Sequence, residues 1–231
     1  MNIIFDLDGT LLNTLDDLHN SVCHALASAR LPKIDRLVTR RFLGNGVKSL
    51  IDNCVTHACP EANERMKVEV FHAFRQYYML HSMDKTAPYP GVVEMLRQCK
   101  ESGLTTAIVS NKLNEAVQDL HRRFFAQYID LAIGETPSVK RKPAPDMVYE
   151  AMRRLSDMKG KQIEKVDCVY VGDSEVDLQT AANAGLECIA VSWGFRDREW
   201  IEQCGAKVII DTPSELLSTL PALAAKADID K

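Results

Sequence analysis

The sequence contains no apolar run that approaches the roughly 20 residues needed for a membrane-spanning helix. It also lacks an excess of basic residues, because 28 lysines and arginines stand against 32 aspartates and glutamates and give a formal net charge of -4. A surface that binds nucleic acid or an anionic membrane needs concentrated positive charge to neutralise phosphates. We therefore expect no nucleic-acid partner and no membrane partner.

The chain also lacks the usual marks of an exported protein. Its first residues include Asp6 and Asp8 and have no basic start of the kind found in signal peptides. The seven cysteines are an odd number, and several stand in apolar segments, such as Cys168 and Cys188. This pattern is typical of reduced thiols in a cytoplasmic protein, which is the location that we expect.

Two aspartates, Asp6 and Asp8, follow a short apolar run over residues 2–5. Isolated ionised carboxylates are costly to bury, so they are usually solvated, paired or bound to a cation. In an extended strand, residues two apart point to the same side, so both side chains can face one site. Gly9 then lets the chain turn away.

The order of helical and extended segments predicts an α/β fold. Apolar residues recur at helical spacing near the start of the chain, over residues 15–29, 47–57 and 61–80. Farther along, helical patterns alternate with short apolar runs, as in a parallel sheet covered by helices on both faces. The predicted strands are residues 2–5, 105–109, 129–133, 166–171, 187–191 and 207–210.

One connection is too long for this alternation. The first strand ends near Asp6 and the next begins at Thr105, whereas a complete crossover unit takes only about 30 residues or more. The surplus residues, 14–83, carry the helical patterns. We therefore predict a Rossmann-like, doubly wound parallel sheet core of residues 1–13 and 84–231, with an inserted all-helical domain of residues 14–83.

Polar residues gather where the predicted strands end. Ligands bind outside the carboxyl ends of the strands in open parallel sheets, so these residues are expected to share one site. They are Asp6, Asp8, Ser110, Asn111, Lys142, Asp173, Ser174 and Asp177. Clustered aspartates are hard oxygen ligands suited to Mg²⁺. An aspartate can also attack phosphorus as a nucleophile, provided that a metal and a lysine offset the charge that develops.

The same residues resemble the four motifs of the haloacid dehalogenase superfamily, and of its phosphatase branch in particular. In chain order, the motifs are Asp6-Leu7-Asp8-Gly9-Thr10, Ser110-Asn111, Lys142-Pro143, and Gly172-Asp173-Ser174 through Asp177. The resemblance covers essentially the whole chain, and the inserted helical segment corresponds to the cap domain of the family.

The resemblance implies a role for each matching residue. Asp6 would be the nucleophile and Asp8 the general acid and base, while Ser110 would hold the phosphoryl group and Lys142 would orient and neutralise it. Mg²⁺ would be bound by Asp6, Asp173 and the backbone carbonyl of Asp8. Two further residues would support the site, namely Asp177, next to Lys142 or a metal-bound water, and Ser174.

Finer features resemble the phosphoglycolate phosphatase group. The similar segments are Phe42–Val47, Tyr89–Val92 and Ser192–Arg196. We include among the candidate substrate-binding residues Thr10 and Asn111 of the core motifs, and Gly44, Asn45 and Lys48 of the cap. For Lys48, an ordinary solvated charge on a helix face is an equally good interpretation.

These features predict a Mg²⁺-dependent phosphomonoester hydrolase that acts on a small phosphorylated metabolite through an aspartyl-phosphate. The leading substrate is 2-phosphoglycolate, by resemblance, and we expect a monomer or a homodimer. A sugar phosphomutase and a pyrophosphatase are the alternative enzymes on the same core. A catalytically silent binding protein is the alternative outside enzymology, and loss of turnover in Asp6→Asn would argue against it.

Overall fold

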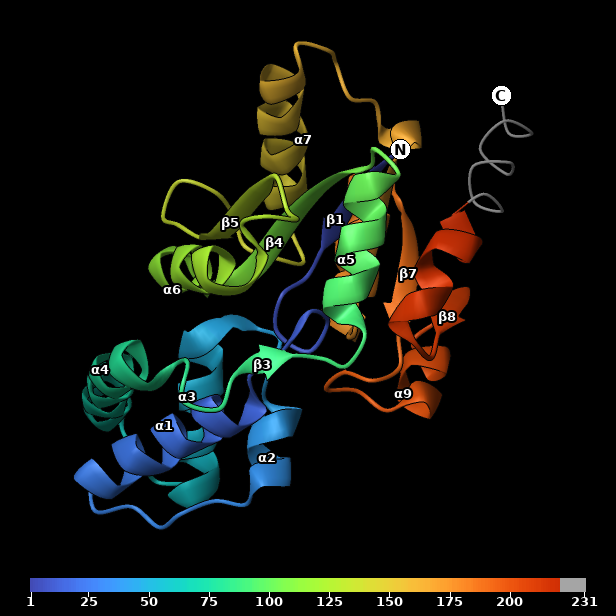
Figure 1. Cartoon of the computed structure of the whole chain (residues 1–231). Helices are drawn as coiled ribbons and strands as arrows, with labels where there is room; N and C mark the ends of the chain where they lie inside the picture. Colours follow the sequence, from blue (N-terminus) through green and yellow to red (C-terminus); the bar gives the residue numbers. More distant parts are fainter. Residues whose placement is uncertain (221–231) are drawn as a thin grey trace. The chain divides into compact units, whose positions relative to one another are not determined.

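The structure, a computed structural model, describes residues 1–220 and consists of two compact units (Figure 1). One unit contains Met1–Leu12 and the chain from Pro88 onward, and the other contains Asn13–Ala87. The domain boundaries predicted from the sequence, at residues 14 and 83, stay a prediction. Among the described residues, no helix is both long and apolar enough to cross a membrane.

The first unit is built on a six-stranded sheet in the order β5–β4–β1–β6–β7–β8. Neighbouring strands are parallel throughout, and in the centre Ile4 lies between Ala107 and Tyr170. The strands are β1 (Asn2–Phe5), β4 (Thr105–Leu113), β5 (Leu131–Glu135), β6 (Cys168–Gly172), β7 (Glu187–Val191) and β8 (Val208–Ile210). The short strands β2 (Leu12–Asn13) and β3 (Ala87–Pro88) pair as a separate sheet.

Helices cover both faces of the six-stranded sheet. On one face, α5 (Val92–Glu101) and α6 (Asn114–Leu120) pack on strand residues such as Phe5. On the other face, α7 (Asp146–Lys159) and α8 (Glu175–Ala184) pack on residues such as Ile4. The α/β fold with a doubly wound parallel sheet is therefore confirmed. The short helix α9 (Arg198–Gln203) precedes β8.

Several strand boundaries differ from the predicted ones. The predicted strand 129–133 is found at Leu131–Glu135, and directly before it the carboxylate of Asp130 accepts a hydrogen bond from the Thr106 backbone nitrogen. The predicted strand 166–171 begins at Cys168, since Lys165–Asp167 form a 3₁₀ turn. Strand β4 continues beyond Val109 to Leu113.

The second unit consists of four helices. They are α1 (Leu15–Ser28), α2 (Arg36–Arg41), α3 (Gly46–Ala58) and α4 (Glu64–His81). Phe74 and Tyr78 of α4 are buried and stack on each other, as the predicted apolar face requires. The buried carboxylate of Asp17 accepts hydrogen bonds from the backbone of Lys85 and Thr86, which ties α1 to the end of the unit.

The largest differences from the predicted helices of this unit are the start of α4 and one additional helix. Helix α4 starts at Glu64 rather than residue 61, because the side chain of Asn63 caps it by accepting from the Met66 backbone. The six-residue helix α2 was not predicted, since it is too short to show a period, although Asp35 caps it in the same way.

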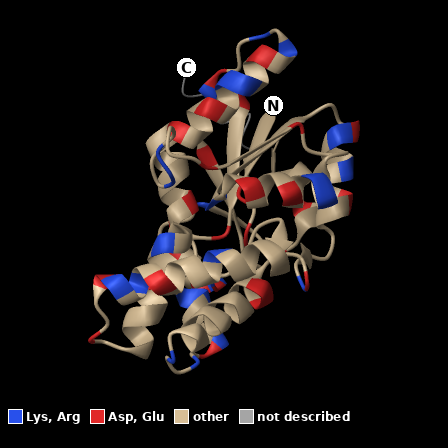
Figure 2. Ribbon diagram, turned by 90° about the vertical axis from the view of Figure 1, so that its left-hand side faces the viewer, with Lys and Arg blue, Asp and Glu red and all other residues tan. Residues whose placement is uncertain are grey.

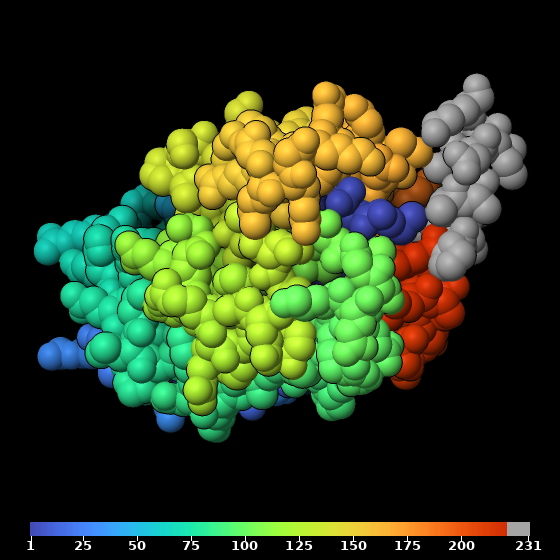
Figure 3. All heavy atoms as spheres, turned by 45° about the horizontal axis from the view of Figure 1, so that its top comes forward, coloured from blue at the N-terminus to red at the C-terminus, as the bar shows by residue number. Residues whose placement is uncertain are grey.

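The surfaces of the helices carry both signs of charge. Figure 2 shows lysines and arginines interspersed with aspartates and glutamates. Some of these residues pair one helical turn apart, such as Arg153 with Asp157. Such exposed pairs contribute little to stability. Figure 3 looks onto the amino edge of the sheet, where the N-terminal residues reach the surface between α5 and residues near 160. The polar residues singled out above lie at the opposite, carboxyl ends of the strands.

Candidate active site

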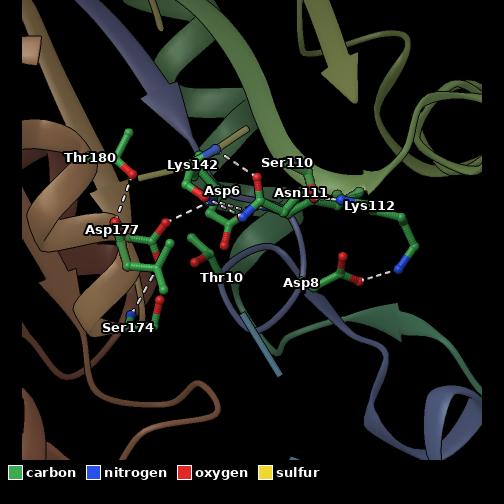
Figure 4. A network of polar contacts seen from close by, with 12 residues as sticks. Asp6, Asp8, Thr10, Ser110, Asn111, Lys112, Lys142, Ser174, Asp177 and Thr180 are labelled. Carbon is green, nitrogen blue, oxygen red and sulfur yellow. Dashed lines mark hydrogen bonds and ion pairs between the residues drawn. The ribbon is translucent and has the colours of Figure 1, made fainter. Parts of the chain in front are cut away.

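A buried ion pair forms the centre of the site. Asp6 directly follows β1, and its Oδ1 lies 2.9 Å from Nζ of Lys142 (Figure 4). The same Nζ lies 2.8 Å from Oδ1 of Asp177, and the phenol of Tyr170 accepts from it at 3.1 Å. Because Lys142 is only 3% exposed, its ammonium is held at a fixed point between the two carboxylates.

Asn111 holds the loop that carries Lys142. Its Nδ2 donates to the backbone oxygen of Lys142 at 3.0 Å, and its Oδ1 accepts from the backbone nitrogen of the same residue at 2.8 Å. The structure thus gives Asn111 a positioning role toward Lys142. Its predicted role in substrate binding stays a prediction.

Asp177 connects the segment that follows β6 to Lys142. Its Oδ2 accepts from the Ser174 hydroxyl at 2.7 Å and from the backbone nitrogens of Ser174 and Asp173, while Oδ1 accepts from Lys142 and Tyr170. Ser174 and Asp177 form a capping box at the start of α8. A first-turn acid that is ordinary in a helix therefore also aligns a buried lysine.

Asp173 is enclosed by backbone and by small residues. Its Oδ1 accepts from the Thr10 hydroxyl at 3.1 Å, and its Oδ2 accepts from the Phe195 backbone nitrogen at 2.7 Å. A Cβ atom on Gly9 or Gly194 would lie closer than 3.0 Å to the Asp173 side chain. Positions 9 and 194 therefore need glycine. The buried Thr10 side chain has a hydrogen-bonding role toward the carboxylate of Asp173.

Burial and mutual repulsion change the ionisation of these groups. The pKa of Asp6 is raised well above 3.8, first by burial and then by Asp177, against the opposing effect of Lys142. Burial and Asp177 also raise the pKa of Asp173 to about 7. Burial lowers the pKa of Lys142, but Asp177 and Asp6 outweigh it and raise the value well above 10.5. The carboxylates thus favour an additional cation nearby.

The residues present fit a divalent metal ion. Carboxylate oxygens of Asp6, Asp173 and Asp177 all lie within 4.8 Å of one another, and an all-oxygen donor set is the one that Mg²⁺ prefers. Asp177 already uses both of its oxygens for Lys142, Ser174 and their neighbours. Asp6 and Asp173 are therefore the stronger candidate ligands.

Sequence analysis missed a second ion pair, between a buried lysine and a partly buried aspartate. Nζ of Lys112 lies 2.6 Å from Oδ1 of Asp8, and the two side chains are 4% and 17% exposed. The only signal in the sequence was the position of Lys112 directly after Ser110 and Asn111. Tyr170 was also missed, since a tyrosine within an apolar strand is ordinary core material.

The remaining candidates belong to the helical unit. Gly44 has a positive φ of 107°, Asn45 precedes α3, and Lys48 forms an exposed ion pair with Asp52 at 2.6 Å. The pair accounts for the charge of Lys48 as a helix-face lysine. The substrate-binding roles of Gly44, Asn45 and Lys48 stay predictions.

A parallel α/β core with an aspartate nucleophile candidate, a buried lysine and an acidic cluster defines a class of phosphoryl-transfer enzymes. The model of the family described as haloacid dehalogenase-like hydrolase matches residues 3–191. The chain therefore belongs to the haloacid dehalogenase-like hydrolase family, and the resemblance stated from the motifs is confirmed.

Curated relatives and solved structures agree with this assignment. A phosphoglycolate phosphatase of Mesorhizobium japonicum is 31% identical over 85% of this chain and 84% of its own length. One from Rhodobacter capsulatus is 33% identical over 84% of this chain and 85% of its own. The crystal structure of a predicted phosphoglycolate phosphatase from Haemophilus somnus 129PT is 29% identical, with a TM-score of 0.84 over 95% and 97% of the two chains. The protein is a phosphatase of this family.

Proposed function

We propose that the protein hydrolyses 2-phosphoglycolate to glycolate and inorganic phosphate, with Mg²⁺ as cofactor and with a phosphoryl group transiently bound to Asp6. The observation that carries the proposal is the placement of Asp6 against the buried Nζ of Lys142, itself fixed by Asp177 and Asn111. The relatives named phosphoglycolate phosphatase support the choice of substrate. Small phosphorylated metabolites are the substrate class.

The chemistry divides into two displacements at phosphorus. A carboxylate oxygen of Asp6 attacks phosphorus, the bond from phosphorus to the ester oxygen breaks, and Asp8 gives its proton to that oxygen. Glycolate leaves. Asp8, now a carboxylate, takes a proton from water as the water attacks the phosphoryl group, which restores Asp6 and releases phosphate. The proton that Asp8 receives is available for the next cycle.

The neighbouring residues neutralise and orient the phosphoryl group. Lys142 offsets negative charge beside Asp6, and the buried hydroxyl of Ser110 can donate to a phosphoryl oxygen. Asp6, Asp173 and the backbone carbonyl of Asp8 would hold Mg²⁺. When bound, Mg²⁺ would supply the positive charge that lets a carboxylate approach a phosphate dianion. Thr10 keeps the Asp173 carboxylate in place.

Phosphate release from a panel of esters tests the proposal. The panel contains 2-phosphoglycolate, glucose 1-phosphate and pyrophosphate, each assayed with Mg²⁺ and with chelator. We expect Mg²⁺-dependent release that is fastest from 2-phosphoglycolate, lost in Asp6→Asn and unchanged in Asp119→Asn, a change on the surface of α6. Preferred release from pyrophosphate, or interconversion of glucose phosphates without release, would instead establish one of the two alternative enzymes.

A folded protein that releases phosphate from none of these esters would support a silent binding role. We also propose a cytoplasmic location and a monomeric or homodimeric state, and size-exclusion chromatography with light scattering measures the latter.

A further inference from the structure

A second buried lysine borders the site beside Asp8. Lys112 stands near the end of β4, is only 5% exposed as a residue, and places its Nζ 2.6 Å from Oδ1 of Asp8. In the view of Figure 4, Asp8 and Lys112 lie on one side of Asp6, and Asp177 lies on the other. The two buried lysines therefore serve different carboxylates, Lys142 the nucleophile and Lys112 the general acid.

The backbone of β4 directs Lys112 to this position. From Val109 to Leu113 the strand advances by four residues, while its partner β5 advances by two, from Ile133 to Glu135. Extra residues of this kind form a bulge, which re-aims side chains at the edge of a site. Within it, the Lys112 backbone nitrogen donates to Oγ of Ser110 at 3.2 Å. A buried ammonium is destabilising unless an anion pairs with it, so Lys112 requires a negatively charged group beside its Nζ.

The position of Lys112 brings its charge close to the leaving group of the proposed reaction. Asp8 gives its proton to the ester oxygen, so that oxygen lies within hydrogen-bond distance of the Asp8 carboxyl group. Nζ of Lys112 lies 2.6 Å from Oδ1 of the same carboxyl group, and an ammonium has three N–H donors, so it can pair with more than one anionic group. An anionic group close to the ester oxygen therefore comes within reach of Lys112. In 2-phosphoglycolate a single methylene group separates that oxygen from a carboxylate, so the carboxylate lies beside the atom that Asp8 protonates.

We propose that Lys112 recognises the carboxylate of the leaving group and makes the enzyme prefer 2-phosphoglycolate to phosphate esters of uncharged alcohols. The inference rests on the proposed function and deepens it by naming the residue that distinguishes this substrate from other phosphate esters. Lys112 takes no part in bond making. It is a specificity-determining residue that also positions Asp8.

The test compares two substrates in three proteins. The substrates are 2-phosphoglycolate and 2-hydroxyethyl phosphate, in which a hydroxymethyl group replaces the carboxylate. The proteins are the wild type, Lys112→Met and the control Lys159→Met, which removes a lysine whose side chain is 47% exposed. A buried charge pair that loses one partner supports an expected fall of about 100-fold in the ratio of the two kcat/KM values for Lys112→Met. The ratio stays at the wild-type value in Lys159→Met.

The ratio separates specificity from positioning. If Lys112→Met only displaces Asp8, kcat/KM falls equally for both substrates and their ratio does not change. An equal fall in kcat/KM for the two substrates would therefore show a positioning role alone and overturn the proposal. In that case the wild-type preference for 2-phosphoglycolate would leave the proposed function standing. A wild type that releases phosphate from neither ester, or shows no preference between them, would overturn the proposed substrate and the role of Lys112 together.

A second measurement needs no variant. Glycolate and glycolamide are similar in shape, but glycolate carries a carboxylate, the group that Lys112 is proposed to bind, where glycolamide carries a neutral amide. In the wild type, glycolate is expected to inhibit at a concentration about 100-fold lower than glycolamide. Equal inhibition by the two compounds would contradict the proposal even if Lys112→Met and Lys112→Gln both fail to fold.

Discussion

The burial of Asp173 beside Asp177 predicts that the metal-free protein loses stability as the pH rises. Burial and then Asp177 raise the pKa of Asp173 from 3.8 to about 7, and the hydrogen bonds from Phe195 and Thr10 compensate only in part. Between these two values the folded protein keeps a proton that the unfolded chain has released. The free energy of unfolding is therefore highest below the lower value and falls until the higher value is reached.

The size of the effect follows from the shift. Each unit of pKa corresponds to about 1.4 kcal/mol, so a shift from 3.8 to about 7 removes about 4 kcal/mol over this interval. Asn cannot ionise, so Asp173→Asn lacks this loss. The difference in stability between the variant and the wild type should thus grow in favour of the variant as the pH rises.

Urea unfolding at a series of pH values, in the presence of chelator, measures this difference. Carboxyl groups outside the site act on both proteins and cancel in the comparison. Asp6 does not cancel, because Asp173 contributes to raising its pKa, and its change acts in the same direction. Asp119→Asn serves as the surface control. Adding Mg²⁺ at the upper end of the range should restore stability to the wild type and not to Asp173→Asn, because binding to the folded state alone stabilises it. A difference curve that is flat between the two pKa values would refute the reasoning.

Three further predictions concern packing and positioning. Gly194→Ala would push a methyl group into Asp173, so we expect a loss of about 1–3 kcal/mol in urea unfolding and a large fall in phosphatase activity. Asn111→Ala removes both hydrogen bonds to the Lys142 backbone, and we expect kcat to fall by at least about tenfold while phosphate released by any residual enzyme still requires Mg²⁺. Asn63→Ala removes the cap of α4 and should cost about 1 kcal/mol in thermal or urea unfolding with no change in kcat, whereas unchanged stability would show that water replaces the cap.

The strand pattern of the core could be predicted because buried parallel strands are apolar along their whole length. Strand β7 has the predicted bounds Glu187–Val191, and β1 likewise matches residues 2–5. Strand β4 shows where this signal stops. Its polar continuation, Ser110 to Leu113, stays extended because tertiary contacts and a bulge hold it, and no periodicity marks such a segment.

The site divides in the same way. Asp6, Lys142, Asp173 and Asp177 could be brought together from the sequence, because each follows a predicted strand and strand ends share an edge. The pairing of Lys112 with Asp8 could not, since it depends on how a bulge turns one side chain. The distinction is physical: topology fixes which segments meet, and local backbone irregularity fixes which atoms touch.

The burial that raises the pKa of Asp173 also makes the net charge of the site important. Four carboxylates, Asp6, Asp8, Asp173 and Asp177, face two ammonium groups, those of Lys112 and Lys142, which leaves two formal negative charges in excess when all are ionised. In a buried environment such an excess is destabilising, and a divalent cation is the smallest group that cancels it. Without the metal, the apolar contacts of the two hydrophobic clusters, one on each face of the sheet, must offset this cost in folding free energy. The instability that the pH series would measure thus has the same origin, an excess of negative charge, as the attraction of the site for a metal ion.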